Sequence, residues 1–545
     1  MTASPISHLL ILPVVLPLVS GALMLVLTGA GGRRGARWVP ALSVLSTLAG
    51  LLLSILLLLQ ADDGTVQAYL LGNWRAPFGI ALALDRLSAL MLVLTSLVAC
   101  ASLLYALGGD ARRGLHFHAL FQFQLMGLNG AFLTADLFNL FVFFEVLLSA
   151  SYGLLLHGGD SGRRARLKAS LHYVVFNLAG SALFLVAASL LYGLAGTLNL
   201  ADLALKLPLL PATDTALVQA AALLLLVVFA LKAALLPLYF WLPDTYGAAS
   251  APVAALFAIM TKVGVYAVLR LTTGVFGLGP GAIGPTANVA LPMLPALGLA
   301  TVGLAAVGAL AARRLRGLVA YLVIGSAGTL LLAAGLGTPD SVAAGLFYLV
   351  NSTLAAAAWY LLADRIAASR GGSDSLTPGG LASPWAALGA AFFIAAIAMA
   401  GLPPLGGFFG KALLLQAAGA LPDPALPTRW VVGGVLASSL LVMVALARAG
   451  SALFWERGAV PTGADAPPES PSKPVHGAAI VLLLALIVAA AVGAGPLSAY
   501  TTATAAQLFE RRAITDAVLG AQPVPPALDV RREMREREDG KGFAK

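Results

Sequence analysis

Residues 231–266 read LKAALLPLYFWLPDTYGAASAPVAALFAIMTKVGVY, and this stretch decides the fold class. It is long enough for two membrane helices, because an apolar run of about 20 residues crosses a bilayer. Pro237 interrupts the first run, and Lys232 and Lys262 place one charge in each. A proline inside a helix frees backbone carbonyls, which in lipid is tolerated only where protein or a water-filled cavity satisfies them. The stretch therefore predicts a broken membrane helix that lines a polar cavity, followed by a second membrane helix.

The composition of the whole chain indicates the same environment. Of its 545 residues, 59% are hydrophobic and 10% are charged, whereas soluble domains contain about 25% charged residues. With a mean hydropathy of +0.92, most of the chain must have lipid as its solvent, and we predict an all-α polytopic membrane protein. The single cysteine, Cys100, excludes an intrachain disulfide, a thiolate metal site and an iron–sulfur cluster carried by this chain alone. We expect no metal ion and no cofactor.

Fourteen apolar stretches are long enough to span the membrane. They lie near residues 8–28, 38–60, 84–107, 116–134, 137–156, 169–194, 215–242, 249–271, 288–311, 317–336, 342–363, 384–419, 430–454 and 476–495. The odd-numbered connections carry seventeen Lys or Arg residues and the even-numbered connections carry five. Because positively charged loops stay in the cytoplasm, both termini are predicted on the outer, periplasmic face of the cell inner membrane. The net charge of +9 thus reflects topology, and no nucleic acid partner is expected.

Four charged residues lie inside the predicted spans, namely Glu145, Lys232, Lys262 and Lys411. A charge near the bilayer centre costs about 2.5–3.5 kcal/mol on the mildest scale, and such residues usually mark ion pathways. The alternative is snorkelling of a long side chain to the interface. For Lys262 this fails, since about 15 Å of helix lies on either side of it. The four residues are therefore our candidate proton-translocating groups.

A second broken helix is predicted at AGLPPLGGFFGK, residues 400–411. The two breaks align, since Pro237 followed by Trp241 matches Pro404 followed by Phe408. Paired broken helices in corresponding halves are typical of inverted-repeat transporters, whose binding site lies at the repeat interface. The alternative is that two unrelated helices are kinked.

Further polar residues within the spans predict a hydrated track between the charged groups. They are His172, Tyr173, Asn177, Ser181, Thr261, Tyr266, Asn351, Ser352 and Thr353. Each of them, taken singly, could instead serve a hydrogen bond between packed helices. From about residue 501 the composition becomes polar after a membrane domain of residues 1–500, and RREMREREDGK at 531–541 predicts a solvated C-terminal tail. The alternative for this segment is a helical or partner-docking role.

Three motifs resemble the antiporter-like family shared by Mrp-type multisubunit sodium/proton antiporters and the proton-pumping membrane subunits of respiratory complex I. They are DLFNLFVFFEVLLSASYGLL at 136–155, the stretch at 231–266 and AGLPPLGGFFGK at 400–411. The first resembles most closely the D-type, or PhaD-type, members. The resemblance extends over about residues 100–455.

This resemblance implies fourteen helices with two inverted five-helix repeats, at about 116–271 and 288–454. It also implies that Glu145 pairs with Lys232 and that Lys262 and Lys411 continue the proton path. Two departures stand out, because family members often carry histidine where this chain has Gly247, and histidine or lysine near Asn351. Water is expected to replace those side chains in the link between the half-channels.

From these residues we expect a secondary transporter subunit, not an enzyme, that moves protons along the buried Glu and Lys residues. The expected partners are other membrane subunits of an antiporter complex, the lipid bilayer, protons and a monovalent cation, Na⁺ or K⁺. One alternative is a proton-pumping membrane subunit of complex I or of a related membrane-bound hydrogenase, driven by electron transfer in its partners. Another is a passive scaffold, which the cost of the buried charges disfavours.

Overall fold

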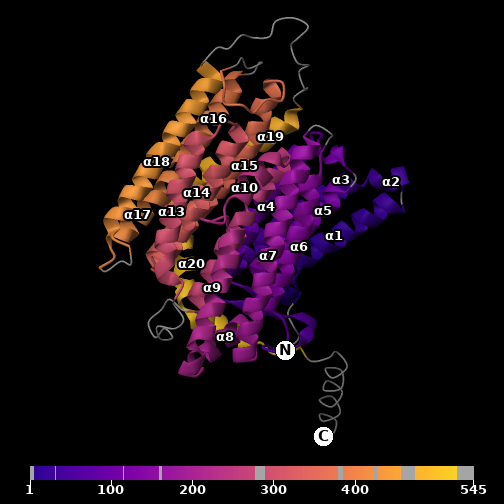
Figure 1. The fold of residues 1–545 in the computed structure, drawn as a ribbon. Coiled ribbons are helices and arrows are strands. Elements are labelled where there is room, and N and C mark those ends of the chain that lie inside the picture. Colours follow the sequence, from indigo (N-terminus) through magenta and orange to yellow (C-terminus); the bar gives the residue numbers. More distant parts are fainter. Residues whose placement is uncertain are drawn as a thin grey trace, which may run out of the picture.

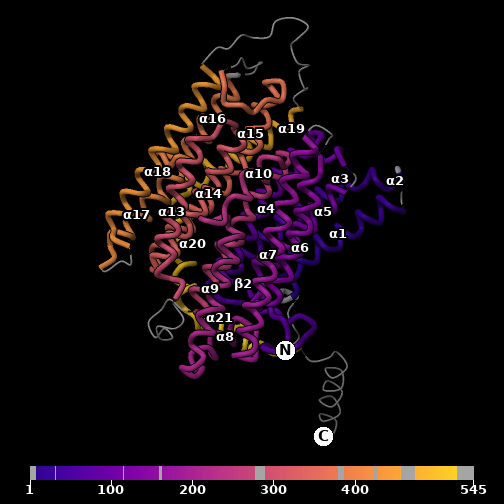
Figure 2. Tube along the Cα trace, viewed as in Figure 1, coloured from indigo at the N-terminus to yellow at the C-terminus, as the bar shows by residue number. Residues whose placement is uncertain are grey.

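The computed structural model describes residues 5–30, 32–114, 116–158, 162–276, 289–378, 385–422, 426–455 and 473–524. The described chain is a bundle of long helices that lie side by side (Figure 1, Figure 2). Within these ranges the strands are limited to β1 (Gln67–Leu70) and β2 (Ala81–Leu84), an antiparallel pair in which Gln67 lies opposite Leu84. The prediction of an all-α polytopic membrane protein is confirmed, apart from this short hairpin.

The longer helices are α1 (Leu12–Gly29), α3 (Val39–Ala61), α4 (Arg86–Ala106), α5 (Phe117–Leu133), α6 (Leu137–Leu156), α7 (Arg163–Ala195), α9 (Thr215–Lys232), α12 (Met260–Arg270), α13 (Leu294–Ala311), α14 (Leu315–Gly335), α15 (Pro339–Ser369), α16 (Trp385–Ala400), α17 (Gly406–Gly419), α18 (Thr428–Gly450), α19 (Pro474–Val492) and α20 (Ala494–Phe509). The shorter α-helices are α2 (Gly32–Ala36), α8 (Leu200–Lys206), α10 (Trp241–Ala248), α11 (Ala251–Phe257) and α21 (Arg511–Gly520).

Twelve helical segments of the described chain are long and apolar enough to cross a membrane by themselves. Every one of the fourteen predicted spans coincides with a helix or a pair of helices. The two that fall short are α5, which has 17 residues, and the span at 384–419, which is divided between α16 and α17. The difference between fourteen and twelve is therefore one of helix length and continuity.

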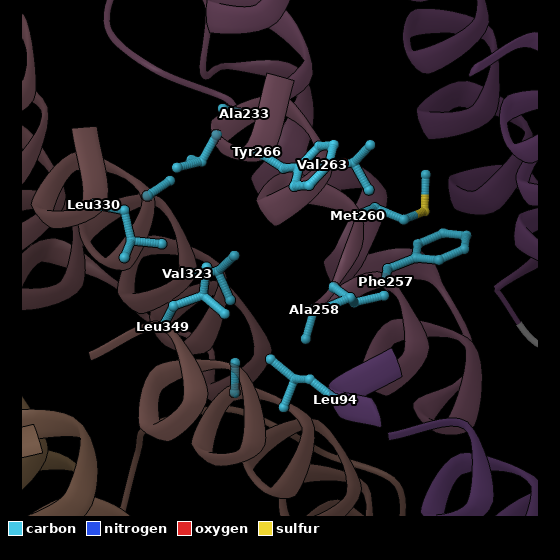
Figure 3. Close-up of a cluster of buried hydrophobic side chains, with 14 of the residues drawn as sticks. Leu94, Ala233, Phe257, Ala258, Met260, Val263, Tyr266, Val323, Leu330 and Leu349 are labelled. Carbon is cyan, nitrogen blue, oxygen red and sulfur yellow. The ribbon is translucent and has the colours of Figure 1, made fainter. Parts of the chain in front are cut away.

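Two spans form the centre of the bundle. The apolar cores of residues 251–275, which include α11 and α12, and of α15 are entirely buried inside the chain. Figure 3 shows apolar side chains from several helices converging around this centre, including Leu94 of α4, Val263 of α12, Val323 of α14 and Leu349 of α15. A charge on α12 is therefore surrounded by protein and not by lipid.

Both predicted helix breaks are present, and side chains satisfy the backbone groups that they free. α9 ends at Lys232 and α10 begins at Trp241, whose indole Nε1 donates to the carbonyl of Leu231 at 3.0 Å. The amide of Leu236 within this break donates to the hydroxyl of Thr301 on α13 at 3.1 Å. Because unsatisfied backbone groups are costly in lipid, these contacts explain how the span tolerates the interruption at Pro237.

The second break separates α16, which ends at Ala400, from α17, which begins at Gly406. The amide nitrogen of the Asn351 side chain donates to the carbonyl of Ala398 at 3.1 Å, and Lys411 Nζ donates to the carbonyl of Ala400 at 2.9 Å. The two breaks thus use side chains from neighbouring helices in the same way. The boundaries of the two inverted repeats stay a prediction.

The first part of the predicted polar tail, residues 501–520, is helical. This segment completes α20 and forms α21, and Thr501, Thr504 and Val518 are buried. The threonines do not require water, because Thr504 donates its hydroxyl to the carbonyl of Tyr500, within its own helix, at 2.7 Å. α20 packs against α15 and α4. The charged segment at 531–541 lies outside the described residues.

The two ends of the described chain lie at the same end of the bundle, beside the β-hairpin. His8, near the start, is 3.3 Å from the hydroxyl of Tyr69 in β1. Near the other end, the backbone N–H and C=O of Val524 each form a 2.7 Å hydrogen bond with the side chain of Asn73. This placement agrees with an even number of membrane crossings.

A buried ion pair joins α4 to α12 close to the same hairpin. Asp85, which caps the N-terminus of α4, accepts two hydrogen bonds from the guanidinium of Arg270, the last residue of α12. Arg270 Nε also donates to the hydroxyl of Tyr266 at 2.8 Å, and that hydroxyl donates to the carbonyl of Phe132 at 2.6 Å. The sequence pattern places Arg270 among the loop cations, whereas its side chain is only 12% exposed.

We expect Asp85→Asn to destabilise the protein by about 3–5 kcal/mol, because it leaves the buried Arg270 without a counter-charge. Asparagine keeps the size of the side chain and can still cap α4, so the variant tests the charge alone. The measurement is the melting temperature of the purified complex in detergent.

The control is Asp63→Asn in the connection before β1. Asp63 is exposed and accepts hydrogen bonds from Thr65, which asparagine can also accept. We expect this control to melt like the wild type. An equal melting temperature for Asp85→Asn would show that the ion pair does not stabilise the fold.

Candidate functional site

The four predicted charged residues lie on four different helices. Glu145 is on α6, Lys232 is the last residue of α9, Lys262 is on α12 and Lys411 is on α17. Lys262 is completely buried and Lys232 is 7% exposed, while Glu145 and Lys411 are partly buried. Glu145 lies within a continuous helix, whereas the three lysines lie beside helix interruptions. Lys232 ends α9 before Pro237, Lys262 is the third residue of α12 after the interruption that follows α11, and Lys411 lies in the second turn of α17.

Glu145 and Lys232 are linked through α7 and not directly. Ser181 donates its hydroxyl to Glu145 Oε1, and Lys232 Nζ donates to Asn177 Oδ1 at 3.0 Å. Asn177 and Ser181 are four residues apart and therefore share one face of α7. No ion pair within 4.0 Å joins Glu145 to Lys232 among the described residues, so the direct pair implied by the resemblance is not found.

An aromatic ring completes the surroundings of Lys232. Its Nζ is 5.8 Å from the centre of the Phe144 ring, which lies next to Glu145 in the sequence. A ring face attracts an ammonium group, so this contact stabilises a charged Lys232 in addition to Asn177. Glu145 itself lines an open, mostly apolar groove of about 470 Å³ between α5 and α6, together with Phe123, Val142 and Ser149.

Lys262 has hydroxyl groups but no carboxylate as partners. Its Nζ donates to Ser326 Oγ of α14 at 2.6 Å and to Thr261 Oγ1 at 3.3 Å. Ser326 in turn donates to the carbonyl of Val323 at 2.7 Å. A buried ammonium group with neutral partners alone is held less firmly in its charged form than one beside a carboxylate, which suits a group that binds and releases a proton.

A small cavity lies between the surroundings of Lys262 and Lys411. It has a volume of about 30 Å³, and Ser326, Thr329, Tyr348, Lys411 and Ser438 provide its polar lining. This volume and lining are sufficient for a water molecule. Because Ser326 is also the acceptor for Lys262, the cavity connects the two lysines through one hydroxyl group.

Lys411 lies directly at the second helix break. Its Nζ donates to the carbonyl of Ala400 and to Ser439 Oγ of α18, both at 2.9 Å. Gly401 has a left-handed backbone with φ of +80°, and a Cβ there would lie 3.1 Å from Lys411 Nζ. The break therefore brings a free carbonyl to Lys411 and leaves space for its ammonium group.

The link between Lys232 and Lys262 is a packing contact. α12 approaches α9 closely at Gly264, where an added Cβ would lie 2.7 Å from the backbone nitrogen of Ala233. Among the hydrogen bonds of the described residues, none joins Lys232 to Lys262 or to its partners. Polar side chains thus lie between Glu145 and Lys232 and between Lys262 and Lys411.

The other predicted polar residues divide into two groups. Asn177, Ser181 and Thr261 contact the charged groups. Asn351 packs against the second break, and its Oδ1 is buried without a hydrogen-bond partner. The remaining residues do not contact the four charged groups: His172 is exposed on α7, Tyr173 binds Ser151, Tyr266 binds Arg270, Ser352 binds the carbonyl of Leu349, and the hydroxyl of Thr353 has no partner.

Sequence reasoning missed the hydroxyl groups that neighbouring helices place around the lysines. Ser326 on α14 binds Lys262 and Ser439 on α18 binds Lys411, while Thr329 on α14, Tyr348 on α15 and Ser438 on α18 line the small cavity. Ser326 and Thr329 are three residues apart within an apolar span, and this spacing was the available signal. In the part of the chain that the structure describes, no three His, Cys, Asp or Glu side chains are grouped so that they could hold a metal ion.

Comparisons with known proteins agree with this arrangement. Residues 134–437 match the family model described as NADH:quinone oxidoreductase/Mrp antiporter, TM. The chain is 41% identical to the probable D subunit of the K(+)/H(+) antiporter of Rhizobium meliloti (strain 1021), over 95% of this chain and 98% of that protein. It is 35% identical to the D subunit of the Na(+)/H(+) antiporter of Bacillus subtilis (strain 168), over 94% and 99%.

A solved structure shows the same fold. A chain of the Mrp complex from Dietzia sp. DQ12-45-1b matches with a TM-score of 0.82 and 27% identity, over 95% of this chain and all of that chain. The matched family segment begins just before α6 and ends within α18, so it contains all four buried charged residues. The chain belongs to the family of NADH:quinone oxidoreductase and Mrp antiporter membrane subunits.

Proposed function

We propose that this chain is the proton-translocating subunit of a multisubunit monovalent cation/H⁺ antiporter. The observation that carries this proposal is the set of charged residues buried on four helices, joined in two pairs by side-chain amides, hydroxyl groups and a small polar cavity. Buried charges of this kind are costly and mark ion pathways. The names of the two relatives, both of them D subunits of antiporters, support the same function.

The proton moves stepwise in this proposal. The charges of Glu145 and Lys232 influence each other across the face of α7 that carries Ser181 and Asn177. Lys262 and Lys411 exchange a proton through Ser326 and a water molecule in the small cavity. Two ammonium groups repel each other strongly in a low-dielectric interior, so the arrival of a proton at one lysine favours its release from the next. The titrations of such neighbouring groups are coupled, which permits charge to pass along the axis without any one group crossing the membrane.

Partner subunits are part of the proposal, because several helices leave much apolar surface uncovered. The apolar cores of the α3, α18 and α19 spans are each only 28% buried inside the chain, so lipid or neighbouring subunits must cover the rest. We also infer that the end of the bundle with the odd-numbered connections faces the cytoplasm and that both termini are periplasmic. The excess of Lys and Arg in those connections supports this orientation.

The test uses everted membrane vesicles from a host without its own sodium/proton and potassium/proton antiporters. With the complete set of subunits present, addition of Na⁺ or K⁺ should cause a proton flux that a fluorescent pH probe detects. Omission of this chain should abolish the flux, and this chain alone should give none.

Two outcomes would contradict the proposal. Cation-driven proton flux from the purified single chain in liposomes would remove the need for partner subunits. Proton pumping that depends on an electron donor and not on Na⁺ or K⁺ would instead support a redox-driven membrane subunit, the alternative within the same family.

A further inference from the structure

A second group of titratable residues lies at the end of the bundle where the odd-numbered connections gather. Asp110 belongs to the short helix Asp110–Arg113 after α4, and Asp364 lies near the C-terminal end of α15. Tyr105, in the last turn of α4, is fully buried and donates its hydroxyl to Asp364 Oδ2 at 2.6 Å. The two carboxylates are thus brought to one place by segments more than 250 residues apart in the sequence.

The two carboxylates are bound very differently. Asp364 accepts hydrogen bonds from both Tyr105 and Arg316, the latter at 2.6 Å. Asp110 is 6% exposed, and its carboxylate pairs with Arg113 at 3.1 Å, an arginine whose side chain is 58% exposed. Because an exposed arginine is well solvated, it compensates a buried carboxylate poorly. Asp364 is therefore held by two hydrogen-bond donors, whereas the carboxylate of Asp110 has only the solvated Arg113 as its partner.

Charged and titratable groups from every neighbouring element act on this site. Burial, followed by the negative charge of Asp364, raises the pKa of Asp110 to about 6, while Arg113 and Arg316 oppose this change. His157, after α6, binds the backbone carbonyl of Asp110 at 2.9 Å, and burial lowers the pKa of His157. The other neighbours are His118 on α5 and Arg166 on α7, which both interact with His157, and His476 on α19. The ring of His476 lies 4.6 Å from that of Tyr105 and is near Arg365 and Lys473.

Close to this site, Tyr360 carries a buried hydroxyl group without a hydrogen-bond partner. Tyr360 is one helical turn before Asp364 on α15, is 1% exposed, and its hydroxyl has no hydrogen-bond partner. Its ring lies 6.0 Å from that of Tyr246 on α10, the segment that follows the first helix break. A buried hydroxyl without a partner is unusual, and this one lies on the same helix as Asp364, four residues before it.

We propose that Asp110, held beside Asp364 and Tyr105, is the group through which protons pass between the translocation path and the water at the predicted cytoplasmic face. This inference rests on the proposed function. When the cation is expelled, the carboxylate of Asp110 accepts a proton from the path and becomes a carboxylic acid. It then releases the same proton to water and regains its charge. Arg113 and the other exposed cations keep hydrated the place where the proton passes from Asp110 to water.

The first test is a titration that does not depend on transport. In the purified complex, infrared difference spectroscopy should detect the carbonyl band of a carboxylic acid that appears as the pH falls through about 6. The band should be absent in Asp110→Asn. It should persist in Asp202→Asn, a matched control in which a buried carboxylate that pairs with Lys206 is changed at the other end of the bundle.

The second test measures transport in everted vesicles, whose bath faces the predicted cytoplasmic side. Wild-type flux should fall as the bath pH is lowered through about 6, because a protonated Asp110 cannot accept another proton. The flux of the Asp110→Asn complex should be several-fold lower at neutral pH, and it should not fall further as the bath pH is lowered through about 6. Asp202→Asn should keep the wild-type profile.

Persistence of the infrared band in Asp110→Asn, or an unchanged pH profile in an assembled Asp110→Asn complex, would overturn the inference. If Asp110 only clamped the helices, the variant would melt earlier and its flux would fall equally at every pH, which would also overturn it. A failure of the proposed antiport function would be recognised separately, because the infrared titration requires no transport.

Discussion

Glu145→Gln should lower cation-driven proton flux strongly, by at least about tenfold, while leaving the complex assembled. Glutamine keeps the size of the side chain and can still accept the hydrogen bond from Ser181, so the substitution removes only the charge. Two unit charges about 4 Å apart interact by about 4 kcal/mol at an effective dielectric constant of 20, and by less at the larger separation of Glu145 and Lys232. A difference of about 1.4 kcal/mol corresponds to a tenfold change in the equilibrium between the charge states of the pair. We therefore expect a fall in rate of at least about tenfold.

Two further variants make this result specific to the charge. Glu145→Asp keeps the charge with a shorter reach and should retain partial activity. Ser149→Ala changes a hydroxyl that lines the same groove, one turn further along α6, and should transport like the wild type. Wild-type rates from a fully assembled Glu145→Gln complex, checked by native gel, would refute a role for the carboxylate charge.

Glu145 and Lys232 interact across residues of α7 and do not form a direct ion pair. The resemblance implied a direct pair between Glu145 and Lys232, yet Asn177 and Ser181 lie on the path between them. Such an arrangement lets the two charges sense each other without fixing them in one hydrogen-bonded geometry. A tight buried salt bridge would instead resist the change of charge that a proton relay requires.

The membrane spans could be predicted from sequence because they depend on local properties. Length and hydropathy of single segments decide whether a helix crosses lipid, and Pro237 and Pro404 interrupt helices wherever those helices are packed. The buried charges were recognisable for the same reason, since Glu145 and Lys262 stand out against apolar neighbours. Each of these features needs information from no more than about 20 residues.

The contacts among helices could not be predicted in this way. Ser326 lies 64 residues from Lys262, and which face of α14 it occupies depends on how α12, α14 and α15 pack together. The ion pair of Asp85 with Arg270 was missed because both residues lie at the ends of apolar runs, where the sequence is equally typical of exposed loops. α20 was missed because threonines that bond to their own backbone look as polar as solvated ones.

Lys262 allows the sharpest distinction between a proton relay and a fixed positive charge. Its ammonium group is fully buried and has two hydroxyl acceptors, of which Ser326 at 2.6 Å is the closer. Arginine would keep the positive charge and long side chain, but it cannot be deprotonated in a protein. If Lys262 must release its proton, Lys262→Arg should be inactive although the charge is retained.

Lys262→Met provides the second arm, because it removes the charge and preserves an unbranched side chain. Replacement of a buried charge by an apolar side chain is often neutral or stabilising, so this complex should assemble and melt no earlier than the wild type, yet transport nothing. Lys206→Arg, at an exposed lysine paired with Asp202, is the matched control and should be fully active. Cation-driven flux in everted vesicles decides the outcome. Substantial activity in Lys262→Arg would mean that a permanent charge suffices, and substantial activity in Lys262→Met would remove Lys262 from the path, so that protons would have to pass between the two halves by water alone.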